Sequence, residues 1–190
     1  MKKMFLLPIV FLLVFALSAC TEDVTVGNNG SSSKSAGSTS KATKEKIHKQ
    51  VKINFSNSTA GQTTKVDSAE IKDVSDLNLT DNELDNITYV LLIHISVSNK
   101  AKDAATTFPS QGHIVLDDGT QIDGLVGADV SIDDAFKDGD VASGATKSGY
   151  VVFPLKEDQA KRFQKGAFKF DVMAGDNMLT TKKYDVAIHF

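Results

Sequence analysis

The stretch Thr88-Tyr-Val-Leu-Leu-Ile-His-Ile-Ser-Val-Ser98 carries the strongest strand pattern in the chain. Its odd-numbered positions are all apolar, and its even-numbered positions change from mostly apolar to polar at His94. A period of two indicates a β-strand. One wholly apolar face beside a mixed one is typical of a central sandwich strand that emerges from beneath a covering loop. We therefore interpret the odd-numbered side chains as core and not as an apolar ligand groove.

Weaker strand patterns flank this stretch on both sides. The turn Asp117-Asp-Gly-Thr120 lies between two apolar runs, and Asp-Gly is a strong hairpin signal. We expect a turn at 56–62, polar loops at 76–86 and 99–106, and an acidic irregular segment at 128–140 whose Ile132 and Phe136 reach back to the core. The expected further strands are 47–55, 66–74, 113–116, 121–126, 150–155, 168–172 and 184–190, with a helix-like turn at 157–162.

Seven or eight strands at short intervals with almost no helix favour an all-β fold. The expected architecture is an antiparallel immunoglobulin-like β-sandwich, and a small barrel is the alternative. The sequence contains one cysteine, so no disulfide can form within the chain, and the core must be stabilised by packing.

The first twenty residues have the outline of a secretory signal peptide. Lys2 and Lys3 precede an apolar run from Met4 to Ala19, which is followed by Cys20. The run spans about 16 residues, short of the roughly 20 that a membrane-spanning helix needs. A permanent transmembrane helix is therefore the less favoured interpretation.

The end of this run, Leu17-Ser-Ala-Cys20, resembles a bacterial lipobox. The resemblance implies that the Cys20 sulfur carries a diacylglyceryl group and that cleavage falls between Ala19 and Cys20. Two acyl chains on one residue suffice for stable membrane attachment, whereas one chain is marginal. The alternative is an incidental cysteine at the end of a soluble secreted protein's leader.

Three parts follow from these patterns: a lipoprotein signal peptide at 1–19, lipidated Cys20 with a disordered Ser/Gly/Lys-rich linker to residue 46, and a β-sandwich domain at 47–190. Residues 61–190 carry 21 acidic side chains against 13 Lys and Arg, a net charge of −8. A domain with a net negative charge is not expected to bind nucleic acid.

Eight aspartates lie within residues 117–140 and raise the question of a metal site. Hard cations such as calcium prefer oxygen ligands. The spacing, however, does not follow the calcium-loop pattern, and aspartate is a common turn residue. We expect no metal, and the candidate ligands, if one were bound, are Asp117, Asp118, Asp133, Asp134, Asp138 and Asp140.

The four histidines do not form a recognisable catalytic or zinc-binding motif. His48, His94, His113 and His189 are scattered along the chain, and none lies beside a paired Cys or Glu signature. We expect His94 on the less apolar sandwich face and His189 on an outward strand face. No catalytic residue and no cofactor are predicted.

Several segments together resemble a family of immunoglobulin-like domains of unknown function that is common on lipoproteins of Gram-positive bacteria. The resemblance covers most of residues 64–190 and implies a fold and a location, not a reaction. At one position the chain departs from the family, because Asp138 stands before Gly139 where a proline is usual. The segments that carry the resemblance are Tyr89–Asn99, Phe108, Leu116–Gly119, Asp138–Gly139 and Ser148–Pro154.

These observations favour a non-enzymatic binding or adaptor module, anchored outside the cytoplasm by Cys20. Its partner would be an unknown envelope protein or ligand, and loops 99–112 and 128–147 would form the contact surface. Two alternatives remain: a calcium-dependent or hydrolytic envelope enzyme that uses the acidic loops, and a passive structural or stress-related surface protein.

Overall fold

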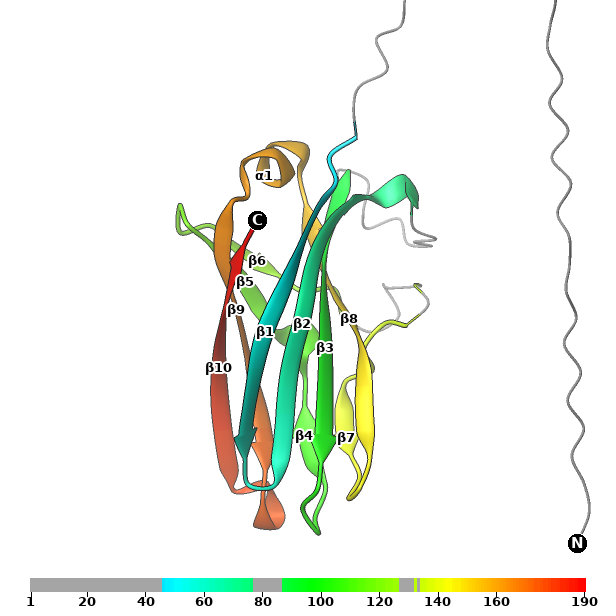
Figure 1. Cartoon of the computed structure of the whole chain (residues 1–190), viewed down its shortest axis with the longest axis vertical. Coiled ribbons are helices and arrows are strands. Elements are labelled where there is room, and N and C mark those ends of the chain that lie inside the picture. The colour runs from blue at the N-terminus through cyan, green and yellow to red at the C-terminus, as the bar shows by residue number, and fades with distance from the viewer. Residues whose placement is uncertain (1–45, 77–86, 127–131, 133) are drawn as a thin grey trace, which may run out of the picture. The chain divides into compact units, whose positions relative to one another are not determined.

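The computed structural model describes residues 46–76, 87–126, 132 and 134–190, and these form two antiparallel sheets packed face to face (Figure 1). The predicted signal peptide, Cys20, the linker up to residue 45 and most of the predicted loop at 76–86 lie outside the described residues. The architecture confirms the predicted all-β antiparallel sandwich.

Sheet A has four strands in the order β1-β2-β3-β8. The stretch around His94 forms β3, which is paired on both sides, as predicted for a central strand. The turn between β1 and β2 is shorter than the predicted 56–62, because strand pairing continues to Thr59 and only Ala60 and Gly61 turn. The strand bounds are β1 Lys49–Thr59, β2 Gln62–Asp73, β3 Tyr89–Asn99 and β8 Thr146–Leu155.

Sheet B is organised around β9. One edge of β9 pairs with β10 along its whole length, while its other edge pairs with β5 in one half and β4 in the other. The outer strands β6 and β7 extend the sheet from β5 and β4. The strand bounds are β4 Ala105–Thr107, β5 His113–Leu116, β6 Gln121–Asp123, β7 Gly139–Val141, β9 Lys165–Ala174 and β10 Thr180–His189.

The described residues thus contain ten strands where the sequence predicts seven or eight. The difference comes from three-residue strands in segments predicted as loops. The expected polar loop at 99–106 runs into β4, and the expected irregular segment at 128–140 runs into β7. The expected strand at 121–126 is shorter, since β6 ends at Asp123.

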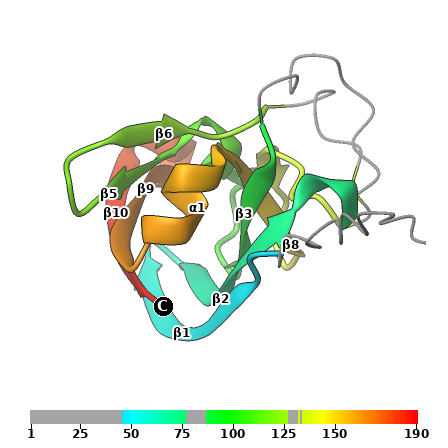
Figure 2. The ribbon, with the colours of Figure 1, turned by 90° about the horizontal axis from the view of Figure 1, so that it is seen from above.

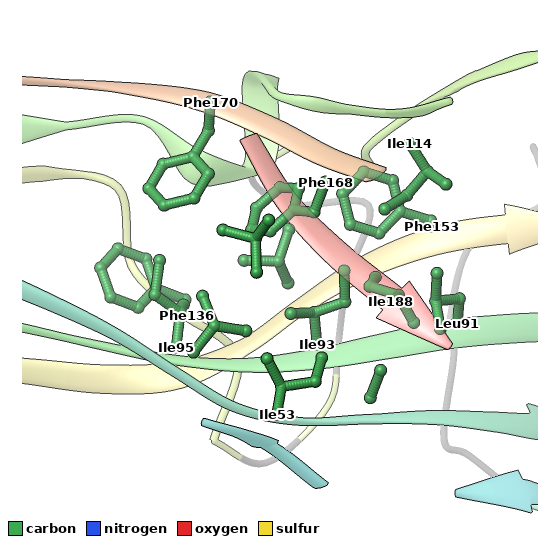
Figure 3. Close-up of a cluster of buried hydrophobic side chains, with 14 of the residues drawn as sticks. Ile53, Leu91, Ile93, Ile95, Ile114, Phe136, Phe153, Phe168, Phe170 and Ile188 are labelled. Carbon is green, nitrogen blue, oxygen red and sulfur yellow. The ribbon is translucent and has the colours of Figure 1, made fainter. Parts of the chain in front are cut away.

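A layer of apolar side chains from both sheets forms the core (Figure 3). Every odd-numbered side chain of β3 from Tyr89 to Val97 is buried in it, which confirms the core interpretation. Sheet B contributes Phe168 and Phe170, whose rings stack with centroids 4.5 Å apart, and Phe153 of sheet A meets Phe168 edge to face. Burying side chains of this size contributes roughly 1.5–3 kcal/mol each.

The other face of β3 changes character along the strand. Val90 and Leu92 are buried in a smaller apolar cluster with Val152, which is covered by Leu125 and Ile132 among others. His94 and the serines beyond it are only partly buried. This confirms the predicted emergence of β3 from beneath a covering segment.

The helix α1 (Glu157–Arg162) lies at the end of the sandwich where β1 begins and β10 ends (Figures 1 and 2). It corresponds to the predicted helix-like turn. Its Ala160 is buried, and Lys49 of β1 donates hydrogen bonds from Nζ to the carbonyls of Lys161 and Phe163, at 2.9 and 2.8 Å. These bonds satisfy carbonyls at the end of the helix, where no intrahelical donor remains.

Asn99 organises the opposite end of the sandwich. Its buried side-chain amide donates to the carbonyls of Asp103 and Val141, at 2.7 and 2.9 Å, and its Oδ1 accepts from the Ala101 N–H at 3.0 Å. One side chain therefore joins the loop after β3 to β7, with every polar atom of the amide group used.

Candidate functional site

An open groove of about 950 Å³ lies beside the outer edge of β8, and we call it the edge groove. Its walls come from three parts of the chain: residues 108–111 with the 3-10 turn η3 (Pro109–Gln111), the pair Leu125–Val126, and the segment 134–138. β8 provides its floor. Loops 99–112 and 128–147, which the sequence predicts as a contact surface, both contribute described residues to it.

The segment 134–138 is held in place by the edge of β8. The Tyr150 N–H donates to the Asp134 carbonyl at 2.8 Å, and the Phe136 N–H donates to the Tyr150 carbonyl at 2.9 Å. The approach is possible because Gly149 has no side chain: a Cβ there would lie 2.5 Å from the Asp134 carbonyl oxygen. Phe136 is 6% exposed and fixes the segment to the core, as predicted.

A second set of bonds ties the other two walls to β8 and to this segment. The Leu125 N–H donates to the Val152 carbonyl at 2.9 Å. The Asp138 carboxylate accepts from the Ser110 hydroxyl and from the Ser110 N–H, the latter at 3.3 Å. Since Ser110 and Asp138 stand on different walls, this carboxylate joins the two loops across the groove.

The groove exposes apolar side chains that the core does not use. Phe108 is 36% exposed and Val126 is 43% exposed, whereas most large apolar side chains of the described residues are buried. Tyr150, which is half-buried, lies in the floor. Apolar side chains in a rigid concave setting suit the docking of a partner's side chain, because burying them removes water from apolar surface.

The predicted metal candidates are not brought together. Asp117 and Asp118 lie at the tip of the β5–β6 hairpin, where Asp118 pairs with Arg162 of α1 at 3.0 Å. Hydrogen bonds from the hydroxyl and backbone N–H of Thr120 hold the pKa of Asp118 below its usual value, and Arg162 adds to the effect.

The remaining candidates lie elsewhere. Asp138 bonds Ser110, Asp140 accepts a hydrogen bond from the Thr106 hydroxyl at 2.5 Å, and Asp134 lies at the edge of β8. Asp133 lies outside the described residues. Within 46–76, 87–126, 132 and 134–190, no three His, Cys, Asp or Glu side chains are grouped so that they could hold a metal ion.

Two of the histidines form pairs with carboxylates on the strands of sheet A. His94 lies 3.1 Å from Asp67 and meets the ring of Tyr150 edge to face, on the less apolar face as predicted. His48 lies 2.7 Å from Glu70. Neither pair lines the edge groove. His189 is exposed on β10, also as predicted.

Some of the residues that shape the groove could not be found from the sequence. Ser110 and Asp138 are separated by 28 positions, and no periodic pattern links them. Gly149 carries the only available signal, since an isolated glycine in a strand often marks a close backbone approach. Cys20 and Ala19 lie outside the described residues, and in the described part of the chain no helix is long and apolar enough to span a membrane.

Comparison with known proteins places the domain in a family. The family model for a domain of unknown function, DUF4352, matches residues 51–175. No curated protein matches the sequence. Among solved structures, a functionally unknown protein from Listeria monocytogenes EGD-e is similar with a TM-score of 0.55 at 11% identity, over 75% of this chain and 88% of that chain.

A second solved structure, that of a "putative lipoprotein (ycdA)" from Bacillus subtilis, has a TM-score of 0.48 at 12% identity. The likeness covers 70% of this chain and 38% of that chain. At these identities the structural likenesses concern the fold alone. The family match agrees with the resemblance found in the sequence and spans about two thirds of the chain. The chain belongs to the DUF4352 family of domains of unknown function.

Proposed function

We propose that this protein is a non-enzymatic binding or adaptor module, held outside the cytoplasm by a diacylglyceryl group on Cys20, and that an envelope protein docks in the edge groove. The anchor is supported by the order of basic head, short apolar run and Leu17-Ser-Ala-Cys20. Two acyl chains on one residue attach a protein stably to a membrane.

The observation that carries the docking surface is the construction of the edge groove. Two loops far apart in the sequence are joined by the Ser110–Asp138 bonds and fixed to β8, so their shape is set before a partner arrives. A rigid site loses less conformational entropy on binding than a flexible one. The exposed Phe108 and Val126 then supply apolar surface that a docked partner would remove from water.

The non-enzymatic part of the proposal is supported by the composition of the groove. Its described lining contains apolar, acidic, basic and hydroxyl side chains but no histidine and no cysteine, and the Ser110 hydroxyl is bound to Asp138. A serine nucleophile needs a base that accepts its proton and a group that orients the base. Docking of a protein requires none of these.

Site-specific photocrosslinking in living cells tests the docking surface. A photoreactive residue at position 126 should give one discrete protein adduct, because this side chain lies in the groove. The same residue at position 65, on an exposed position of β2, is the matched control and should not give that adduct. Loss of the adduct in a Phe108→Ala background would support the groove, whereas equal adducts from both positions would refute it.

A further inference from the structure

A second groove, of about 540 Å³, lies over the outer face of sheet B, and we call it the sheet B groove. Its floor is the outward side of β9, with β10 on one side and the segment from Phe108 to His113 on the other. It shares Phe108 and Gln111 with the edge groove but faces a different direction, since its floor belongs to the other sheet.

The strand in the floor of this groove has a neighbour on each edge. β9 pairs with β10 along one edge and, along the other, with β5 at residues 166–169 and with β4 at residues 172–173. A peptide could not add a strand here, because strand addition needs an unpaired edge. A ligand in this groove must therefore be bound by the side chains that project from the outer face of sheet B.

The side chains on this face alternate in charge across the strands. Lys169 of β9 is opposite Asp185 of β10, with which it forms an ion pair, and opposite His113 of β5. One step along the strands, Asp171 is opposite Lys183, and both are exposed. The two lysines balance the two aspartates, so the groove has no net attraction for a polyanion such as nucleic acid or an anionic lipid surface.

The same side chains supply closely spaced hydrogen-bond donors and acceptors. Lysine ammonium groups donate, aspartate carboxylates accept, and the Gln111 amide does both. At the rim, Phe108 presents an aromatic ring that is 36% exposed. From Lys169 to Met173 the face runs about 13 Å along β9, and the open groove is better suited to part of an extended chain than to an enclosed small molecule.

From this combination we infer that the sheet B groove binds a segment of an uncharged, hydroxyl-rich polysaccharide. Hydroxyl and acetamido groups can pair with Asp171, Lys183 and Gln111, and the apolar face of a sugar ring can pack on Phe108. The inference goes beyond the proposed protein docking and concerns a different surface. If the Asp171 and Lys183 variants bind polysaccharide normally, this inference fails but the proposed protein docking does not, because neither residue lines the edge groove.

Cosedimentation with insoluble polysaccharide tests the inference. The probe is chitin, an insoluble and uncharged polysaccharide with hydroxyl and acetamido groups, mixed with the full chain purified in detergent. Wild-type protein should sediment with the probe, and raised salt should leave binding nearly unchanged, because screening acts on charge attraction. The double variant Asp171→Ala/Lys183→Ala should bind about tenfold more weakly, which is the loss expected for about 1.4 kcal/mol.

The matched control removes one charge of each sign elsewhere, with Lys65→Ala and Asp103→Ala at exposed positions, and should bind like wild type. Thermal melts of all proteins report whether they are folded. Should the double variant melt early, Lys183→Gln decides in its place, because Lys183 does not line the edge groove, and weaker binding than that of wild type is expected. The inference is overturned if wild type fails to sediment, if the groove variants bind like wild type, or if raised salt abolishes binding.

Discussion

Replacing Gly149 with alanine should detach the wall of the edge groove from β8. The added Cβ would lie 2.5 Å from the Asp134 carbonyl oxygen, 2.7 Å from the Phe136 nitrogen and 2.9 Å from the Ala135 carbonyl carbon. All three atoms belong to the backbone, so no side-chain rotation can relieve the contacts. The segment 134–136 must move away from the strand.

The expected loss of stability follows from what that movement breaks. Two backbone hydrogen bonds to Tyr150 are lost, each contributing about 0.5–1.5 kcal/mol. The ring of Phe136 is 6% exposed, and the movement would expose more of it. Part of the roughly 1.5–3 kcal/mol that burial of this ring contributes would then be lost. We expect Gly149→Ala to lower the free energy of unfolding by about 3 kcal/mol.

Urea denaturation measures this loss, and hydrogen exchange at the Phe136 and Tyr150 amides locates it. The matched control is Gly119→Ala at the tip of the β5–β6 hairpin. There φ is +82° and a Cβ would meet no atom within 4 Å, so only the backbone conformation is strained, at a cost of about 1 kcal/mol. Equal losses from the two substitutions would refute the role given to Gly149.

Three further changes have defined outcomes. Asn99→Asp should cost about 3 kcal/mol or more by urea denaturation, because the buried carbonyls of Asp103 and Val141 lose their donors; a loss below about 1 kcal/mol would contradict this. Burial raises the pKa of Tyr184 in the folded protein, so stability should fall as pH rises above the unfolded-state value of about 10. Tyr184→Phe should reduce that fall, and an unchanged alkaline profile would oppose it. Calcium or a chelator should leave the melting temperature unchanged, since Asp118 and Asp138 are bonded to other groups, whereas a rise with calcium would favour the enzyme alternative.

The parts of the fold that follow a simple period were predictable from the sequence. The odd-numbered side chains of β3 are buried because alternation places them on one face, and Phe136 reaches the core as an apolar residue in an acidic segment. β4 was not predictable. The polar run 99–106 predicts a loop, yet Thr106 and Thr107 are buried in a strand, because their hydroxyls donate to the Asp140 carboxylate and the Asp171 carbonyl.

The candidate sites were also predictable from the sequence only in part. The two loops of the edge groove were predictable as segments, since loops on a sandwich are the usual contact surfaces. Their junction through Ser110 and Asp138 was not, because it depends on how two sheets stack. The sheet B groove likewise depends on strand register: Asp171 and Lys183 are 12 positions apart and become neighbours only through the pairing of β9 with β10.

Intact-mass spectrometry of the protein extracted from cell membranes addresses the proposed anchor most directly. Lipidation requires a chain that begins at Cys20 and carries the added mass of a diacylglyceryl group. An unmodified Cys20, or a chain that begins at another residue, would contradict the attachment on which the proposed function depends.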